Sequence, residues 1–434
     1  MHEYDVIIIG GGISGLYSAL KILEHKPDIS ILILEKNIKS KFGGRLGNYN
    51  FYGTNIVKGA GIGRKNKDIL LQKLLKKLKI ETREFQVKKQ YSQIMNKNDV
   101  LSISDTVKKL RNIYNQNKKK SLNSYNFMTF KKFGMKVLGH DNYKRFLIST
   151  GYRDFEKTDV YETLYKYGFD DTDKGWIGLS IPWSELIKKL SYKIGFNKIK
   201  FNQNVISINS FPTLNEKKSK YAKYTNDTDN TNDTKYIIKT KSGKKYLCKK
   251  IIVGSTIDTV KNLFNKNPIY NDIRGQVFLR MYGKFSGESI DIMKKYAPVS
   301  IIVKTRIQKI IPINAEKGVY MISYCDNKNA IHYKPYLTNN KKNRLFWVNQ
   351  IQKALGLKFP LKLQSIKGFY WNIGTHYYKP LNPNYKTRNN FIDIAQHPDK
   401  NILVVGEMIS RKQGWTEGAL ESVEKVVTPE WIDS

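Results

Sequence analysis

The sequence predicts an α/β protein in which a doubly wound, Rossmann-type domain is joined to a second domain of mixed sheet plus helices. The first observation is YDVIIIGGGISGLYSALKIL, residues 4–23, where an apolar strand precedes a glycine-rich turn and a segment of helical period. The second is ISILILEKN, residues 29–37, where another apolar strand ends in an acidic residue. The third is a C-terminal stretch, residues 401–427, that again contains a buried strand, a glycine-bearing turn and a helix.

The first turn carries Gly10, Gly12 and Gly15 at the spacing G-x-G-x-x-G, between the predicted strand and the predicted helix. In that setting the first glycine allows a tight turn, the second lets the backbone approach a pyrophosphate, and the third lets helix and strand pack closely. Glu35 follows 20 residues after Gly15, where a carboxylate accepts hydrogen bonds from ribose hydroxyls and repels a 2′-phosphate. These residues predict a site for a dinucleotide with an unphosphorylated ribose, its phosphates facing the N-terminus of the helix.

Length and composition narrow the class of protein. The 434 residues suffice for two or three domains, and no run of about 18 apolar residues predicts a membrane-spanning helix. The first strand begins too near residue 1 to leave room for a signal peptide. Two cysteines, Cys248 and Cys325, and six dispersed histidines predict neither a disulfide framework nor a metal site. We therefore expect a protein of the cytoplasm or another reducing compartment, not a secreted one.

The formal net charge of +39 is unevenly distributed along the chain. Residues 64–150 hold 22 Lys and Arg against 6 Asp and Glu. Lys, Asn, Ile and Tyr are abundant, as is typical of a protein encoded by an AT-rich gene. Such a gene accounts for the number of lysines but not for their clustering. Two interpretations of this basic segment stay open: a solubilising surface, or non-specific association with a polyanion such as nucleic acid. A polar, low-complexity stretch at residues 215–235 predicts a mobile insertion in a hairpin.

Four motifs in order, VIIIGGGISGL, LEKN…GGRLGN, GAGIGRKN and VVGEMISRKQGWTEGALES, resemble the flavin-containing amine oxidase superfamily, which includes monoamine, polyamine and L-amino-acid oxidases. The resemblance covers both ends of the chain well and the middle loosely. It implies a two-domain flavoprotein. We expect a discontinuous FAD-binding domain from residues 1–80, 196–275 and 381–434, and a substrate domain from residues 81–195 and 276–380.

The resemblance also implies which residues hold the adenosine and phosphate half of FAD. The pyrophosphate would lie over the first turn, at Gly10, Gly12, Ile13, Ser14 and Gly15. Glu35 would bind the ribose, and the backbone of Val205 would meet the adenine. Gly44 and Arg45, from the motif G-G-R, would run along the dinucleotide.

For the flavin half, the resemblance places Gly61 and Ile62 near the ring, and Gly406 and Glu407 against the phosphate and ribityl groups. Thr416 begins the last predicted helix, whose N-terminus would stabilise negative charge on the flavin. Some relatives bind FAD through a cysteine in the region that here reads GTHYY. Because no cysteine stands there, we expect a non-covalent flavin.

In the superfamily two aromatic side chains stand over the flavin and enclose the substrate. Trp415 matches one of them, and the stretch YWNIGTHYYKP supplies the other, at His376 or Tyr377. A core tryptophan and an ordinary strand are the structural alternatives for these residues. Relatives also carry a lysine that holds a water near flavin N5. The matching strand has Gln276 or Phe278 at this position, which bears on reoxidation by oxygen.

The sequence therefore predicts an FAD-dependent oxidoreductase that oxidises the carbon–nitrogen bond of a small amine by hydride transfer to flavin N5. One alternative is a desaturase-like or protoporphyrinogen-oxidase-like flavoenzyme that acts on carbon–carbon bonds. The other is a flavoprotein with a mainly structural or polyanion-binding role. The basic segment is the observation that suggests this role.

Overall fold

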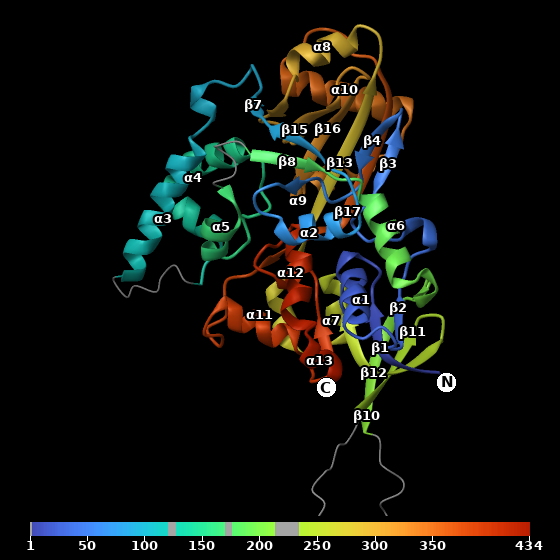
Figure 1. The fold of residues 1–434 in the computed structure, drawn as a ribbon. Coiled ribbons are helices and arrows are strands. Elements are labelled where there is room, and N and C mark those ends of the chain that lie inside the picture. The colour runs from blue at the N-terminus through green and yellow to red at the C-terminus, as the bar shows by residue number, and fades with distance from the viewer. Residues whose placement is uncertain (1, 120–126, 170–175, 213–233) are drawn as a thin grey trace, which may run out of the picture.

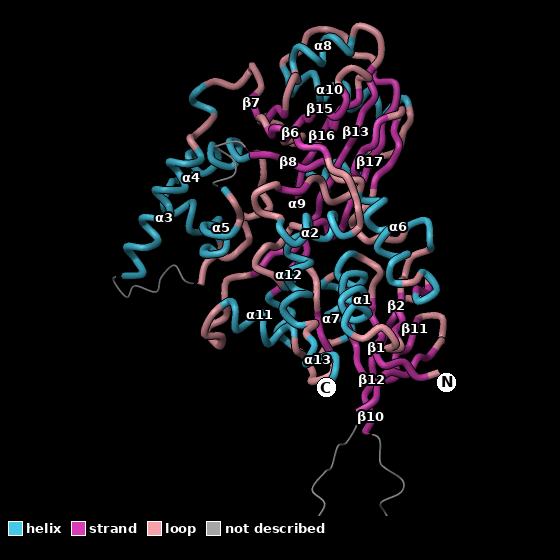
Figure 2. The backbone as a smooth tube through the Cα atoms, viewed as in Figure 1, coloured by secondary structure: helices cyan, strands magenta, loops and turns pink. Residues whose placement is uncertain are grey.

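The computed structural model describes residues 2–119, 127–169, 176–212 and 234–434 (Figure 1). The low-complexity stretch expected at 215–235 falls almost entirely outside these residues. Within them the chain forms two large sheets with helices on their faces, one toward each end of the molecule, and two smaller ones (Figure 2). The expected combination of a doubly wound domain and a second domain of mixed sheet plus helices is confirmed.

The first sheet has seven strands in the order β10-β11-β12-β1-β2-β9, with β18 paired to the end of β12. The strands β12, β1, β2, β9 and β18 run parallel, whereas β10 and β11 join antiparallel. The strand bounds are β1 (Glu3–Ile9), β2 (Ile31–Leu34), β9 (Ile199–Lys200), β10 (Val205–Pro212), β11 (Thr234–Thr240), β12 (Lys245–Val253) and β18 (Ile402–Val404).

Helices cover both faces of this sheet because its central strands are apolar on both sides. Along β1, Val6 and Ile8 pack into one core and Ile7 and Ile9 into the other, as alternation along a strand requires. One face carries α1 (Ile13–His25), α2 (Ile69–Lys77), α6 (Trp183–Ile194), α12 (Thr416–Val426) and α13 (Pro429–Asp433). The other carries α7 (Ile257–Leu263), the 3₁₀ turn η6 (Pro268–Asp272) and α11 (Arg388–Gln396).

The second sheet has six strands in the order β17-β13-β16-β15-β14-β7. Three helices pack on it around a core that includes Trp347 and Tyr333, with the 3₁₀ turn η7 (Lys334–Tyr336) between two of them. The strand bounds are β7 (Lys89–Tyr91), β13 (Ile273–Phe285), β14 (Ser300–Ile302), β15 (Lys309–Asn314), β16 (Val319–Asp326) and β17 (Leu363–Tyr378). The helices are α8 (Ser289–Tyr296), α9 (Asn327–Tyr333) and α10 (Lys341–Leu355).

A separate helical layer lies beside the second sheet (Figure 1) and has its own core, rich in buried phenylalanine. Its helices are α3 (Ile103–Lys119), α4 (Phe130–Thr150) and α5 (Val160–Lys166), and α4 is kinked at Gly139, where φ is +75°. In the part of the chain that the structure describes, no helix is long and apolar enough to cross a membrane.

Short elements connect these layers. They are the hairpin β3 (Asn48–Phe51) and β4 (Thr54–Val57), the three-stranded sheet β5 (Gly63–Arg64), β8 (Trp176–Ser180) and β6 (Arg83–Val87), and the 3₁₀ turns η1 (Lys39–Lys41), η2 (Lys97–Asp99), η5 (Phe196–Lys198) and η8 (Glu407–Ile409).

One segment packs differently from the expected division of the chain. Helix α6 lies within residues 81–195, which were expected in the substrate domain, but its buried face packs against α1 in the core of the first sheet. Trp183, Leu186 and Leu190 form that face, because their spacing places them on one side of the helix.

Candidate active site

The turn between β1 and α1 is shaped by three glycines. Gly10 has φ +109°, and a β-carbon there would lie 2.6 Å from the carbonyl oxygen of Gly254, while one on Gly15 would lie 2.0 Å from that of Gly10. A β-carbon on Gly12 would meet nothing within 4 Å. Gly12 is also the N-cap of α1, and no described side chain caps that helix. The backbone N–H groups of the first helical turn therefore face an open cradle, which fits a phosphate.

Glu35 lies at the carboxyl end of β2, beside this cradle, and is buried. Its Oε2 accepts a hydrogen bond from the backbone N–H of Gly11 at 2.8 Å, and its Oε1 accepts two from Asn37 at 2.7 Å. The backbone N–H of Gln203 donates to the Glu35 carbonyl, which brings the buried Val205 to the same edge of the sheet. These contacts fix the carboxylate and leave it acceptor capacity for ribose hydroxyls.

Two further glycine turns close over the start of α1. Gly44 has φ +64°, and a β-carbon there would lie 3.4 Å from the Cα of Gly12. Gly406 has φ +136° at the end of β18, and a β-carbon there would lie 3.8 Å from the Oγ of Ser14. The carboxyl ends of parallel strands share one edge of the sheet, so these turns meet where doubly wound folds bind ligands. The structure brings together the predicted residues Gly10, Gly12, Ile13, Ser14, Gly15, Glu35, Gly44 and Gly406.

Glu407 is the centre of a buried chain of charged and polar groups. Its Oε1 is 2.5 Å from an Arg45 guanidinium nitrogen and 2.5 Å from Nδ1 of His376, and its Oε2 accepts from the backbone N–H of Gly414 at 3.0 Å. Burial disfavours the charged carboxylate, but His376 and Arg45 outweigh burial and hold the pKa of Glu407 well below its usual range. Glu407 therefore carries a fixed negative charge that holds the Arg45 guanidinium in place.

The expected role of His376 beside substrate requires a side chain that faces an open space. In the structure its side chain is enclosed. The residue is 3% exposed and both ring nitrogens are engaged, because the backbone N–H of Ile257 donates to Nε2 at 3.3 Å. Nδ1 then carries the proton that it shares with Glu407. Burial lowers the pKa of His376, although the adjacent Glu407 opposes the shift. His376 is buried and holds Glu407 in place, and its expected position beside substrate stays a prediction.

Trp415 lies half-buried at the N-cap of α12, and α12 begins at Thr416 as predicted. The guanidinium of Arg64 lies 3.7 Å from the centroid of the Trp415 ring, and the ring of Trp176 meets it edge-on at 6.3 Å. Tyr377 neighbours His376 along β17 and therefore points to the opposite face of the strand. The aromatic ring that flanks Trp415 is that of Trp176, in β8.

The first turn of α12 is tied to a second helix. Both carboxylate oxygens of Glu417 accept hydrogen bonds at 3.0 Å from the first turn of α2, one from the backbone N–H of Leu70 and one from that of Leu71. Close by, Thr375 lies beside Gly414, and its Oγ1 is a buried atom that finds no hydrogen-bond partner among the described residues. A ligand with a polar atom at this point would supply that partner.

Arg280, in β13, contacts the loop that contains Gly59 and Gly61, which was expected near the flavin. It is buried, its Nε donates to the carbonyl of Gly59 at 2.8 Å, and its guanidinium lies 4.3 Å from the Tyr324 ring centroid. A β-carbon on Gly61 would lie 2.9 Å from the Arg280 guanidinium, so Gly61 lies directly against it, and Ile62 follows half-buried. Sequence reasoning did not find Arg280, since nothing local to QVFLRMY indicates which residues face the loop.

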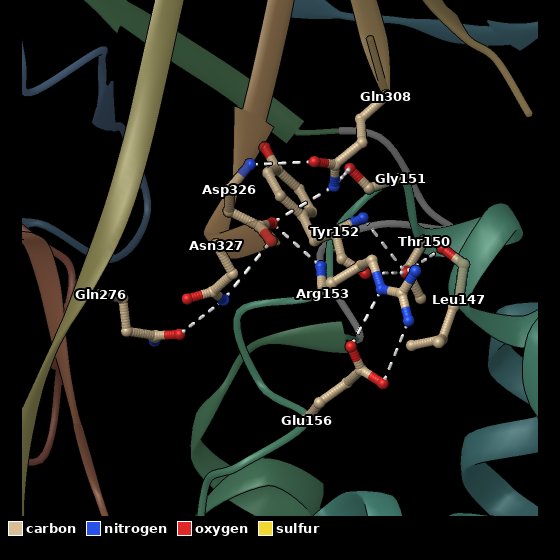
Figure 3. A network of polar contacts seen from close by, with 10 residues as sticks. All are labelled: Leu147, Thr150, Gly151, Tyr152, Arg153, Glu156, Gln276, Gln308, Asp326 and Asn327. Atoms are coloured by element: carbon tan, nitrogen blue, oxygen red, sulfur yellow. Dashed lines mark hydrogen bonds and ion pairs between the residues drawn. The ribbon is translucent and has the colours of Figure 1, made fainter. Parts of the chain in front are cut away.

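Gln276, a buried amide of β13, lies at one end of a polar network that Figure 3 shows from close by. Its Oε1 accepts from Asn327 at 3.0 Å, and the neighbouring Asp326 accepts from the backbone N–H of Arg153 at 2.9 Å and from Gln308 at 3.2 Å. Burial raises the pKa of Asp326 to about 6. The network joins the second sheet to the loop after α4, so Gln276 is held by its neighbours.

The glycine cradle lies at the edge of the first sheet where doubly wound folds bind ligands, and the Glu407 contacts and the Trp415–Trp176 pair lie on segments that follow that sheet edge or pack beside it. Residues 8–78 match the family described as NAD(P)-binding Rossmann-like domain. The whole chain has the fold of putrescine oxidase, a flavin amine oxidase. The superfamily resemblance expected from the sequence is confirmed at the level of the fold.

Two solved structures show this agreement. Wild-type putrescine oxidase bound to putrescine superimposes with a TM-score of 0.70 at 10% identity, covering 98% of this chain and 98% of the oxidase. A putrescine oxidase variant from a redesign of cofactor binding superimposes with a TM-score of 0.72, again at 10% identity, over 99% of both chains.

A viral relative is similar over a short stretch. Uncharacterized protein R188 of Acanthamoeba polyphaga mimivirus is 35% identical over 82 residues, which cover 18% of this chain and 16% of that protein.

Proposed function

We propose that the protein is an FAD-dependent oxidoreductase that oxidises the carbon–nitrogen bond of a small amine. The observation that carries the proposal is the open cradle at Gly12 within a chain that has the putrescine oxidase fold from end to end. The cradle would hold the pyrophosphate, Glu35 the adenosine ribose, and Arg45 with Glu407 the middle of the dinucleotide. Bound FAD would supply the hydride acceptor, and the chain would supply binding, orientation and electrostatics.

The chain's own residues would define the space for substrate. Trp415, held between Arg64 and Trp176, forms an apolar wall at the start of α12. Arg280 and Gln276 contribute a buried cation and an amide from β13. A wall of this kind packs an alkylamine and excludes water from the reacting carbon. A small diamine such as the putrescine bound by the structural relative is the first substrate class to test.

We propose that FAD is bound without a covalent bond and that the protein works in a reducing compartment. Both cysteines of the chain are free thiols, and both are buried in sheet cores, Cys248 in β12 and Cys325 in β16. Burial raises the pKa of the Cys248 thiol to about 12, so it is a poor nucleophile. Neither thiol lies in β17, the strand that holds the GTHYY region where the superfamily resemblance implies the attachment cysteine of some relatives.

A second function, oxidation of a carbon–carbon bond with an acceptor other than oxygen, is supported by Gln276. Gln276 or Phe278 stands where the superfamily resemblance implies a lysine, and the Oε1 of Gln276 accepts a hydrogen bond from Asn327. Flavin reduction by amines, compared under anaerobic conditions with flavin reduction by substrates that offer only a carbon–carbon bond for oxidation, separates the two functions.

The test starts with the purified protein. A flavin absorption spectrum, and release of all yellow colour into the supernatant on acid precipitation, are the expected results. Colour retained in the pellet would exclude non-covalent binding, and a colourless protein that takes up no FAD would overturn the flavoprotein assignment.

The second test concerns the substrate. A panel of diamines and monoamines is tested anaerobically for flavin bleaching. Bleaching by an amine supports amine oxidation, and bleaching by none of them contradicts it.

A further inference from the structure

Two adjoining cavities lie outside the dinucleotide site, between α4, the loop that follows it, the connection from β14 to β15, and helices α9 and α10. Their volumes are about 380 Å³ and about 500 Å³. They share Arg153, Lys304, Thr305 and Asn329, and together we call them the basic cleft. Its cationic lining comes from separate segments of the chain: Lys131, Lys144, Arg153, Lys304, Arg306 and Lys353.

The positive charge of the basic cleft is largely uncompensated. Among the described residues that line the cleft, Glu156 is the one carboxylate, and Arg153 binds it at 2.9 Å. Lys304 pairs with Asp99 at 2.7 Å, from outside the cleft. The other four cations have no carboxylate within ion-pair distance among the residues that the structure describes: Lys131, Lys144, Arg306 and Lys353. Four unpaired cations around one concave space create a potential that attracts anions.

A second, independent feature lies on the wall that the two cavities share. The Oγ1 of Thr305 is a buried atom without a hydrogen-bond partner among the described residues. Thr305 opens the turn to Gln308, whose backbone N–H donates to the Thr305 carbonyl at 3.1 Å and whose φ is +62°. Buried hydroxyls in native structures are nearly always partnered, so this one points to a ligand atom that completes its hydrogen bonding.

The polar wall of the cleft is fixed in place. Arg153 donates from Nε to Glu156, and its backbone N–H donates to Asp326, which Gln308 also contacts (Figure 3). Its Nη2 also donates to Glu156, at 3.4 Å, so this carboxylate takes one edge of the guanidinium. Among the described residues Nη1 has no partner, and it can donate to a phosphate oxygen. Apolar side chains such as Met135, Leu147 and Val303 line the first cavity and suit an organic group attached to the phosphates.

We propose that the basic cleft binds a small polyphosphorylated ligand with two or three phosphate groups. The cations surround a concave space from several elements and do not form a flat stripe, which favours a compact anion over the backbone of a nucleic acid. Only Lys131 and Lys144 among its cationic lysines and arginines belong to the basic segment 64–150, so the cleft is distinct from the polyanion surface considered for that segment.

Binding of inorganic tripolyphosphate to the full-length, FAD-loaded protein tests the proposal, because FAD then occupies the dinucleotide cradle. Isothermal titration calorimetry at about 50 and about 200 mM salt should show one site whose affinity falls as salt rises. The double variant Arg306→Ala with Lys353→Ala should bind at least tenfold more weakly. Both side chains are exposed, so the fold is retained. The matched control removes Lys341 and Lys342, two exposed charges at the other end of α10, and should bind as the parent does.

Thr305 gives a test that leaves the charge unchanged. Thr305→Val removes the hydroxyl and should weaken binding severalfold, whereas Thr305→Ser retains it and should restore the parental affinity. Equal losses in the two double variants would overturn the proposal, because they would show a general effect of charge. The absence of tripolyphosphate binding at about 50 mM salt, or tighter binding of random duplex DNA that displaces it, would overturn it as well.

Discussion

The guanidinium of Arg64 lies 3.7 Å from the centroid of the Trp415 ring, so a cation from β5 covers one face of an indole at the start of α12. Arg64 is itself held by Asp68, with contacts of 3.0 Å and 2.6 Å to the same carboxylate oxygen. Both members of this ion pair are buried. The orientation of the Trp415 ring is therefore set by segments that lie some 350 residues apart in the chain.

Trp415→Ala should retain FAD and lose most amine turnover, because the wall that packs the alkyl chain is removed while the dinucleotide cradle is untouched. We expect kcat to fall at least tenfold, about 1.4 kcal/mol of transition-state stabilisation. Trp431→Phe, on α13 and away from the wall, is the control. Steady-state turnover of an amine that bleaches the flavin is the measurement. Turnover within about a factor of two of the parent, well under 1 kcal/mol, would show that Trp415 is only a core residue.

Glu35→Gln should weaken FAD binding without changing the fold, because the amide keeps the shape of the side chain and loses the charge. A hydrogen bond to a charged group contributes roughly 1.5–3 kcal/mol, which corresponds to about a 10- to 100-fold higher Kd. Equilibrium dialysis against FAD measures this. Glu316→Gln, on a carboxylate whose side chain is 83% exposed, serves as the matched control. If both variants retained FAD equally, Glu35 would only hold the end of β2 in place and would not bind the ribose.

Two alanine substitutions in the turn between β1 and α1 should affect different properties: one the binding of FAD and the other the stability of the apoprotein. Gly12→Ala places a methyl group in open space, so the apoprotein should keep its melting temperature while the phosphate cradle is narrowed and FAD binds more weakly. Gly15→Ala places a methyl group 2.0 Å from the Gly10 carbonyl oxygen and should lower the melting temperature of the apoprotein itself. Thermal melts with and without FAD separate the two effects. Strong destabilisation of the apoprotein by Gly12→Ala would show that the cradle is not open.

Glu407 should make stability depend on pH in the acid range. Its pKa is held below the ordinary value of 4.5, so its contribution to stability is fully present above that pH and is lost as the pH falls. At pH 7, Glu407→Gln should cost about 3 kcal/mol, since it removes the negative charge that pairs with Arg45 and His376 and turns an amide NH2 group toward the backbone N–H of Gly414. The difference from the parent should shrink as the pH is lowered from about 5 to 3. Urea unfolding across that pH range measures the difference in the free energy of unfolding. Glu288→Gln, at an exposed carboxylate, is the control. A difference that does not depend on pH would contradict the ionised state of Glu407.

Local pattern predicted the residues whose role is set by the backbone near them. Gly10, Gly12, Gly15 and Glu35 could be assigned because strand, turn, helix and strand follow one another within about 35 residues. Thr416 was predicted as the start of the last helix for the same reason, and α12 begins there.

Residues that meet across the fold could not be assigned in this way. Whether His376 or Tyr377 faces the interior depends on the pairing of β17 with β13, which includes a register shift, so the strand pattern alone could not decide it. Trp176 meets Trp415 only because β8 pairs with β5 and β6, and the short apolar run of β8 lies in a glycine-rich stretch that resembles a loop. The burial of Arg280 follows from its contact with Gly59 on a distant loop.

The pairing of β18 with β12, and of α12 with α1, has a consequence for synthesis on the ribosome. Leu403, Leu420 and Val423 come from the last part of the chain, yet they fill the same core as Leu16 and Leu20. That core stays open until translation has passed α12, on the order of tens of seconds after α1 has been made. During this interval the apolar faces of α1 and β1 are without their final neighbours, so we expect nascent chains to depend on chaperones that shield apolar surface.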